Sequence, residues 1–274
     1  MSESLAKKRL AVLGAGKMGG ILLQAFVKSG VVAADNLCAT VAHPERAKAL
    51  AKQMNISVTC DNRAAARNAD VILVCVKPQA VGEVLQQIRD EVSAGQVVIS
   101  VAASVPTSYI EERLPAKAVV VRAMPNTPAM IGAGITGVCA GSCATAQHLH
   151  MACRLFETVG RTVTVDEKHM DAVTGLSASG PAFIYIVLES LAEAGVKVGL
   201  PRDLATLLAA QTTMGASRVV LETGNHPALL KDAVTTPAGC TIDGIMELAE
   251  GKLRVTLIKA VVKATQRAKE LLFA

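Results

Sequence analysis

Short apolar runs and helix-like stretches alternate along the first 165 residues. The uninterrupted apolar runs predict strands at residues 10–13, 37–41, 71–76, 97–101 and 118–122. Between them, apolar residues at helical spacing predict helices at 21–29, 43–54, 81–88 and 108–113. Because parallel strands covered on both faces read as continuous apolar runs, this order indicates an α/β domain built on a parallel sheet.

Strand patterns end after one more strand-like segment at 162–165, and only helical patterns follow. They predict helices at 171–176, 182–194, 202–223, 241–250 and 253–272. We therefore expect two domains, residues 1–166 and 167–274, the second of them all-α. The last helices are apolar on more than one side, which favours a homo-oligomer with a subunit interface on this domain.

A glycine-rich turn directly follows the first predicted strand. It reads Gly14-Ala15-Gly16-Lys17-Met18-Gly19 and opens the first predicted helix. In this pattern the first glycine permits a tight turn, the second lets the backbone approach a pyrophosphate, and the third packs the helix on the strand. An ordinary turn is the alternative, but the position between strand and helix favours a dinucleotide site in a Rossmann-type, doubly wound sheet.

The end of the second predicted strand bears on which nicotinamide cofactor binds. NAD-specific folds place an acidic residue there to bind the ribose 2′-hydroxyl. The segment 38–44 contains no acid, and His43 and Arg46 are available for a 2′-phosphate. We therefore predict that the cofactor is NADPH, with NADH as the alternative. If the cofactor is NADH, His43 and Arg46 are simply solvated residues at a helix start.

A loop at 231–241 precedes a predicted helix and is rich in small and hydroxyl-bearing residues. Small residues leave backbone N–H groups open, so the loop could cradle a carboxylate at a helix N-terminus. Alternatively it is a plain helix start with Thr241 as N-cap. From the residues alone, both interpretations stay open.

Composition narrows the remaining classes. Hydrophobic residues make up 51% of the 274 residues, aromatic residues only 2%, and the net charge is +5 without a basic cluster. With few aromatic side chains for stacking, we expect no nucleic-acid partner. Seven scattered cysteines without a C-x-x-C pair indicate thiols in a reducing compartment and no metal site. We expect that no apolar run reaches the roughly 18 residues that a membrane span needs, and therefore that the protein is cytoplasmic.

Five segments together resemble pyrroline-5-carboxylate reductase over nearly the whole chain. They are residues 14–19, 76–78, 122–128, 171–182 and 230–241. The resemblance implies NADPH-dependent reduction of 1-pyrroline-5-carboxylate to L-proline, the last step of proline biosynthesis. It also implies an N-terminal Rossmann-type domain, a C-terminal dimerisation domain, and dimers that assemble into a larger ring.

The resemblance also implies a set of site residues. Thr241 would be catalytic, its hydroxyl facing the ring nitrogen. The substrate would meet Glu167, Ser177, Ser179, Thr236, Gly239, Cys240 and Thr241. The cofactor would bind along Leu13, Gly14, Ala15, Gly16, Lys17, Met18, His43, Asn62, Cys75, Val76, Lys77, Pro78, Val101, Ala102 and Ala103. Gly224, Ala233 and Cys240 depart from the family's pattern.

Two other functions fit parts of the sequence. A β-hydroxyacid dehydrogenase also pairs a dinucleotide domain with a helical one, but the helix after Gly180 lacks the lysine of that family. A protein that senses NADPH without turnover is the second alternative, and the open small-residue loop at 231–241 argues against it.

Overall fold

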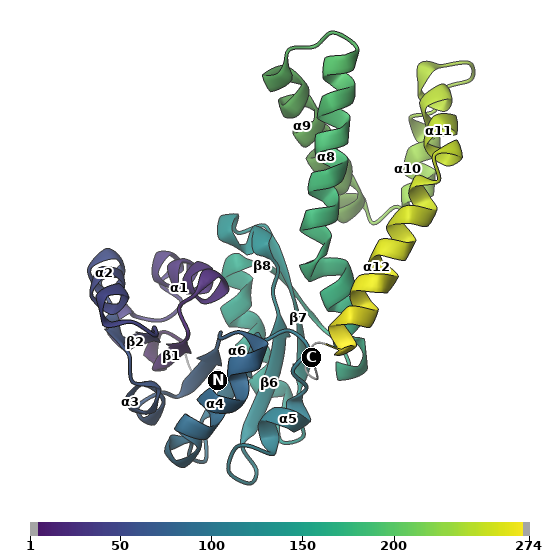
Figure 1. The fold of residues 1–274 in the computed structure, drawn as a ribbon. Helices are drawn as coiled ribbons and strands as arrows, with labels where there is room; N and C mark the ends of the chain where they lie inside the picture. The colour runs from purple at the N-terminus through teal and green to yellow at the C-terminus, as the bar shows by residue number, and fades with distance from the viewer. Residues whose placement is uncertain (1–4, 271–274) are drawn as a thin grey trace. The chain divides into compact units, whose positions relative to one another are not determined.

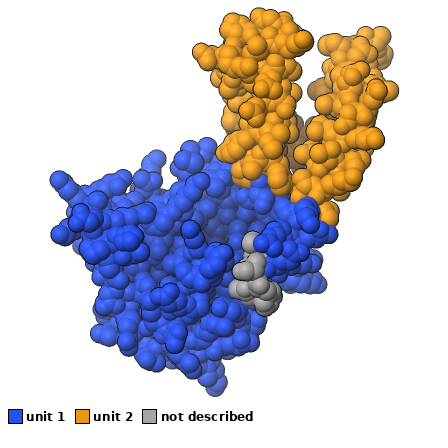
Figure 2. Space-filling view, in the orientation of Figure 1, with its two compact units in different colours: residues 1–179, 263–274 blue, residues 180–262 orange. Residues whose placement is uncertain are grey.

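The computed structural model describes residues 5–270 (Figure 1). The chain forms two compact units, residues 1–179 with 263–274 and residues 180–262 (Figure 2). This division falls later in the chain than the predicted boundary after residue 166, and the last helix contributes to both units. The domain boundary after residue 166 therefore stays a prediction.

The first unit is built on one sheet of eight strands in the order β3-β2-β1-β4-β5-β6-β7-β8. All neighbouring strands are parallel except β6 and β7, which are antiparallel. The strands are β1 (Leu10–Leu13), β2 (Leu37–Thr40), β3 (Ser57–Thr59), β4 (Val71–Val74), β5 (Val97–Ser100), β6 (Val119–Met124), β7 (Gly134–Ala140) and β8 (Gly160–Thr164). The reversal of strand order at β1 and β4 is that of a doubly wound fold, which confirms the predicted fold class.

Alternate residues of the strands build two separate cores. Leu10 and Val12 point to one face of the sheet, and Ala11 and Leu13 point to the other. The first face is covered by α1 (Lys17–Ser29), α2 (Pro44–Met54) and α6 (Ala146–Phe156). The second is covered by α3 (Asn62–Arg67), α4 (Pro78–Ile88) and α5 (Thr107–Glu111).

Strands β3 and β7 and helices α3 and α6 were not predicted. Strand β3 has three residues and is partly exposed at the sheet edge, so it shows no apolar run. Strand β7 contains Gly134 and Gly137, which weaken its strand pattern, and Thr136 interrupts its apolar run. Its burial comes from packing between β6 and β8.

After β8 the chain passes through η6 (Glu167–His169), α7 (Met170–Val173) and a π-helical turn, η7 (Thr174–Ala178). The predicted helix at 171–176 is confirmed, but from Thr174 onward it is π-helical rather than α-helical. In the π-turn the amide of Ser179 donates to the carbonyl oxygen of Thr174 at 3.0 Å, five residues back. Turns of this kind are often found at functional sites.

The second unit is helical, as predicted. Its elements are α8 (Gly180–Lys197), α9 (Arg202–Thr223), α10 (Pro227–Ala233), α11 (Cys240–Glu250) and the start of α12 (Leu253–Glu270). Of these, α10 is not among the predicted helices. The predicted last helix extends to 272, and its final two residues lie outside the described part. Helices α8 and α9 lie side by side (Figure 1) and approach closely through Gly195 and Ala205.

One helical stretch among residues 5–270, Glu167–Lys197, is long and apolar enough to cross a membrane by length and composition. Its mean hydropathy is 1.3, and only 11% of its most apolar window is buried. The expectation that no segment reaches this threshold is therefore wrong. One such helix is weak evidence for a span, because helices that pack against other protein surfaces pass the same test.

Candidate dinucleotide and substrate sites

A cavity of about 480 Å³ opens at the carboxyl ends of β1, β2, β4 and β5. Its size suits a cofactor, and its place is where doubly wound sheets bind their ligands. It is lined by Gly14, Ala15, Gly16, Lys17, Met18, Val41, Ala42, Arg46, Cys75, Val76, Lys77, Pro78, Ala80, Val101, Ala102 and Ala103. The structure thus brings together all of the predicted cofactor residues except Leu13, His43 and Asn62.

The glycine turn has the geometry that its sequence predicts. Gly14 has a φ of 89°, and a Cβ on it would lie 2.6 Å from Cγ1 of Val76. Its amide donates to Oγ1 of Thr40 at 3.0 Å, which ties the turn to the end of β2. A Cβ on Gly16 would meet no protein atom within 4 Å, so the space above this backbone is open to a ligand. The free N–H groups at the start of α1 favour a phosphate there.

The first turn of α2, which follows β2, brings a positive charge to the cavity, and no Asp or Glu among the described residues lines it. Arg46 lines the cavity, and its Nη2 donates to the carbonyl oxygen of Ala15 at 2.8 Å. A guanidinium has five N–H donors, so others remain for a phosphate. His43 is the exposed N-cap residue of α2 and does not line the cavity.

Two further predicted cofactor residues lie apart from the cavity wall. Leu13 is fully buried in the sheet, so only its backbone can reach a ligand. Asn62 begins α3, and its Nδ2 donates to Oε1 of Gln87 at 2.7 Å. Their roles, and that of His43, stay predictions.

Cys75 follows β4 and forms part of the cavity wall. Burial raises the pKa of its thiol well above the ordinary value. The thiol is therefore neutral at physiological pH and presents a small, uncharged side chain to the cavity.

Glu167 is held by groups of the first unit. Its carboxylate accepts hydrogen bonds from the amide of Thr107 at 2.7 Å and from the hydroxyl of Thr107 at 2.6 Å. Nη1 of Arg122 lies 3.4 Å from the same carboxylate. Ser177 lies in the π-turn and Ser179 directly after it, and both are half-buried.

The second predicted site lies in the other unit, at the start of α11. Gly239 is the N-cap residue and α11 begins at Cys240, so the alternative of Thr241 as N-cap is wrong. Ala238 has a left-handed φ of 55°, and Thr236 packs against Gly239 through its hydroxyl. Cys240 is exposed, and the half-buried Thr241 has no side-chain hydrogen-bond partner within residues 5–270. The first amides of α11 lack intrahelical partners and can bind a carboxylate.

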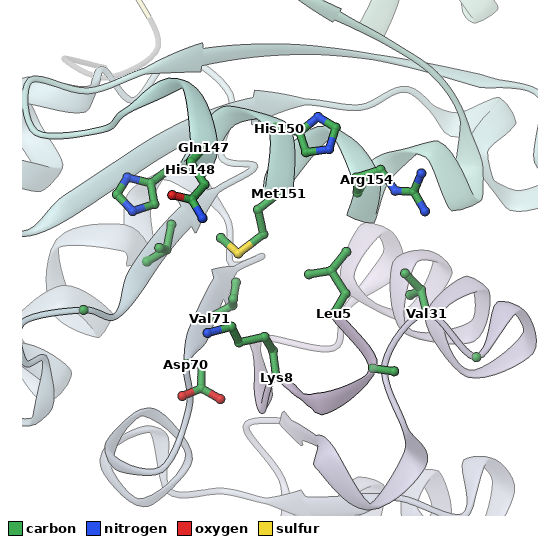
Figure 3. A pocket seen from close by; sticks show the side chains of 14 residues that line it. Leu5, Lys8, Val31, Asp70, Val71, Gln147, His148, His150, Met151 and Arg154 are labelled. Atoms are coloured by element: carbon green, nitrogen blue, oxygen red, sulfur yellow. The ribbon is translucent and has the colours of Figure 1, made fainter. Parts of the chain in front are cut away.

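Another cavity, of about 510 Å³, lies at the opposite edge of the sheet (Figure 3). The side chains of Leu5 and Met151 point into it. Two of its polar groups already have partners: Nδ1 of His148 accepts from the amide of Thr145, and Arg154 pairs with Glu157 at 3.8 Å. This edge holds the amino ends of β1, β4 and β5, so the cavity is not where such a sheet binds a dinucleotide.

No group of three His, Cys, Asp or Glu side chains in residues 5–270 is arranged to hold a metal ion.

Two known families match different parts of the chain. Residues 9–104 match the family described as NADP oxidoreductase, coenzyme F420-dependent. Residues 167–271 match the family described as pyrroline-5-carboxylate reductase dimerisation.

Several proteins that are similar over nearly the whole chain are pyrroline-5-carboxylate reductases. The chain is 42% identical to the pyrroline-5-carboxylate reductase of Methanosarcina acetivorans, over 97% of this chain and 99% of that protein. It is 33% identical to the Escherichia coli enzyme of that name, over 97% and 98% of the two chains. A solved pyrroline-5-carboxylate reductase from Coxiella burnetii has a TM-score of 0.89 and 34% identity, covering 96% and 98%. That of Plasmodium falciparum, solved with NADP bound, has a TM-score of 0.87 and 28% identity, covering 96% and 98%. With this identity over its whole length, the chain belongs to the pyrroline-5-carboxylate reductase family.

Proposed function

We propose that this protein reduces 1-pyrroline-5-carboxylate to L-proline with NADPH. The observation that carries the proposal is the cavity at the carboxyl ends of the strands, lined by the glycine turn and by Arg46, in a chain that belongs to a reductase family. Bound there, NADPH supplies the hydride for the C=N carbon of the substrate. Arg46 and the absence of an acid at this cavity favour a cofactor with a 2′-phosphate.

The substrate carboxylate binds the free amides at the start of α11, near Cys240 and Thr241. The Thr241 hydroxyl orients the ring nitrogen, and Ser177 and Ser179 form part of the pocket wall. A cyclic imine is basic enough to react as its iminium, so the protein contributes mainly by positioning. Holding two reactants in place can supply on the order of 7–11 kcal/mol of the barrier.

The protein works as a homo-oligomer, and we propose that its dimers assemble further into a ring. The support lies in the second unit, where large apolar side chains are exposed on α8, α9, α11 and α12. They include Ile186, Leu207, Met214, Leu248 and Ile258. A subunit interface would also cover the apolar stretch Glu167–Lys197. A cytoplasmic location, and the absence of membrane and nucleic-acid partners, are part of this proposal.

The test is steady-state kinetics on the full chain and on Thr241→Ala and Thr241→Ser. The parent should reduce pyrroline-5-carboxylate, prefer NADPH to NADH, and leave a β-hydroxyacid with NADP⁺ unchanged. A hydrogen bond to a charged group contributes about 1.5–3 kcal/mol, so Thr241→Ala should lower kcat/KM by roughly 10–100-fold. Thr241→Ser should keep most of the activity. No turnover by the parent would refute the function, and full activity of Thr241→Ala would refute only the role of this residue.

A further inference from the structure

Asn126 connects two segments that are distant in the sequence. Its side chain is buried between the end of β6 and the π-turn η7. Nδ2 donates to the carbonyl oxygen of Ser177 at 3.2 Å and lies 3.4 Å from the Ser177 hydroxyl. Oδ1 accepts from the amide of Ile135 at 3.0 Å. The side-chain amide of Asn126 thus forms hydrogen bonds through both its oxygen and its nitrogen, the oxygen to β7 and the nitrogen to the π-turn.

The carbonyl of Ser177 cannot make the hydrogen bond that an α-helix would give it. In an α-helix it would accept from the amide four residues later, which is Pro181, and proline has no N–H. Buried carbonyl groups are nearly always paired, and leaving one unpaired is costly. Asn126 supplies the donor that Pro181 cannot.

The register of the π-turn fixes where its side chains point. The Ser179 amide donates to the carbonyl of Thr174, and the Thr174 hydroxyl donates to the carbonyl of Met170 at 2.9 Å. The amino end of the turn is therefore held by hydrogen bonds within the helical segment itself. Gly175 packs against Thr265 so closely that a Cβ on it would overlap the Thr265 hydroxyl. At its carboxyl end, the turn is held by the side-chain hydrogen bond from Asn126.

From this geometry we infer that Asn126 is a positioning residue for the reduction, acting through Ser177. It holds the carbonyl of Ser177 and thereby sets the direction of the serine hydroxyl at the wall of the substrate pocket. This inference rests on the proposed function, which places Ser177 at that wall.

Asn126→Asp tests the donated hydrogen bond specifically. The new side chain has the same shape and can still accept from Ile135. As a carboxylate, however, it cannot donate to Ser177, whereas as a neutral carboxylic acid it can. Burial raises the pKa of such a carboxyl group, so the donor returns at mildly acidic pH.

The expected result is a pH-dependent defect. At about pH 7.5, kcat of Asn126→Asp should be at least about tenfold below that of the parent, because small misplacements of a positioned group are costly. KM for NADPH should stay within about twofold, since Asn126 does not line the dinucleotide cavity. The ratio of variant to parent kcat should rise as the pH falls to about 5.5; taking the ratio cancels the titration of the substrate itself.

Two further variants complete the test. Asn36 also donates from Nδ2 to a backbone carbonyl, that of Ala6, at 3.1 Å, so Asn36→Asp is a matched control that should keep the parental kcat at every pH. Asn126→Ala removes the donor without adding a charge and should lose kcat by the same factor at every pH. The inference is overturned if the ratio for Asn126→Asp does not change with pH, or if Asn126→Ala has the parental kcat. A parent that fails to reduce the imine would instead refute the proposed function.

Discussion

The buried Arg122 and the partly exposed Asp171 form an ion pair in which Nη2 lies 3.3 Å from Oδ1. Arg122 lies on β6 with only 4% of its side chain exposed, and its Nη1 also lies 3.4 Å from Glu167. One cation thus serves two carboxylates at the start of the helical segment. Its Nε has no hydrogen-bond partner within the described residues. The pair fastens η6 and α7 to the sheet, just ahead of the turn that Asn126 holds.

Arg122→Met should destabilise the protein strongly, because it leaves two carboxylates facing each other without a cation. Removing one partner of a buried pair costs about 3–5 kcal/mol, and the partial exposure of both carboxylates lowers the expectation to about 2–4 kcal/mol. Asp171→Asn keeps Arg122 paired with Glu167 and should cost less. Urea unfolding at one fixed protein concentration measures both variants, since oligomer stability depends on concentration. A loss below about 1 kcal/mol for Arg122→Met would contradict this account.

Two adjacent glycines of α1 should respond differently to the same change. A Cβ on Gly19 would overlap the carbonyl oxygen of Gly14 and lie 3.0 Å from Cβ of Cys75, so Gly19→Ala should push α1 away from β1. We expect KM for NADPH to rise at least about tenfold, as the helix start leaves the pyrophosphate position. A Cβ on Gly20 would meet no protein atom within 4 Å. Gly20→Ala should therefore keep KM and gain up to about 1 kcal/mol of stability from helix propensity. Equal KM values for the two variants would contradict the packing role of Gly19.

Much of the first unit was predictable because a strand that is buried on both faces appears in the sequence as a continuous apolar run. Strands β1 and β4 are apolar at every position and β5 at every position except Ser100, and the glycine turn after β1 has a fixed spacing. The dinucleotide cavity follows from these two features, because parallel strands end at one edge. Val41, Ala42 and Ala80 also line it, and no pattern distinguishes them from other small residues.

What the sequence left out depends on contacts between distant segments. Strand β7 takes its place from its neighbours, and the π-turn depends on Asn126, fifty-one residues before Ser177. The missing N–H of Pro181 was visible in the sequence, but the side chain that compensates for it was not. Family resemblance marked both segments, at 122–128 and 171–182, without showing that they touch.

Glu91 joins α3 to the end of α4 by ion pairs whose strength should depend on pH. Its carboxylate accepts from Nε of Arg67 at 2.7 Å and from Nε of Arg63 at 3.2 Å, and its side chain is 10% exposed. Hydrogen bonding from Arg67, followed by that from Arg63, lowers the pKa of Glu91 to about 2 from an ordinary value of 4.5. Because the folded-state pKa is the lower one, the contribution to stability is complete above about pH 4.5. It is lost as the pH falls toward about 2, where the folded form is protonated as well.

Glu91→Gln should therefore lower Tm by a constant amount between about pH 5 and pH 7, and the gap to the parent should narrow below about pH 4.5. High salt should narrow the same gap at neutral pH, since the side chains of Arg63 and Arg67 are more than half exposed. Glu112→Gln is the matched control, because Glu112 is 73% exposed and meets Arg113 only at 3.8 Å. The test is thermal unfolding of the parent and the two variants across this pH range. A Tm difference between the parent and Glu91→Gln that stays constant down to about pH 3 would contradict the prediction. It would show that the ion pairs with Arg63 and Arg67 do not hold the carboxylate in its charged form.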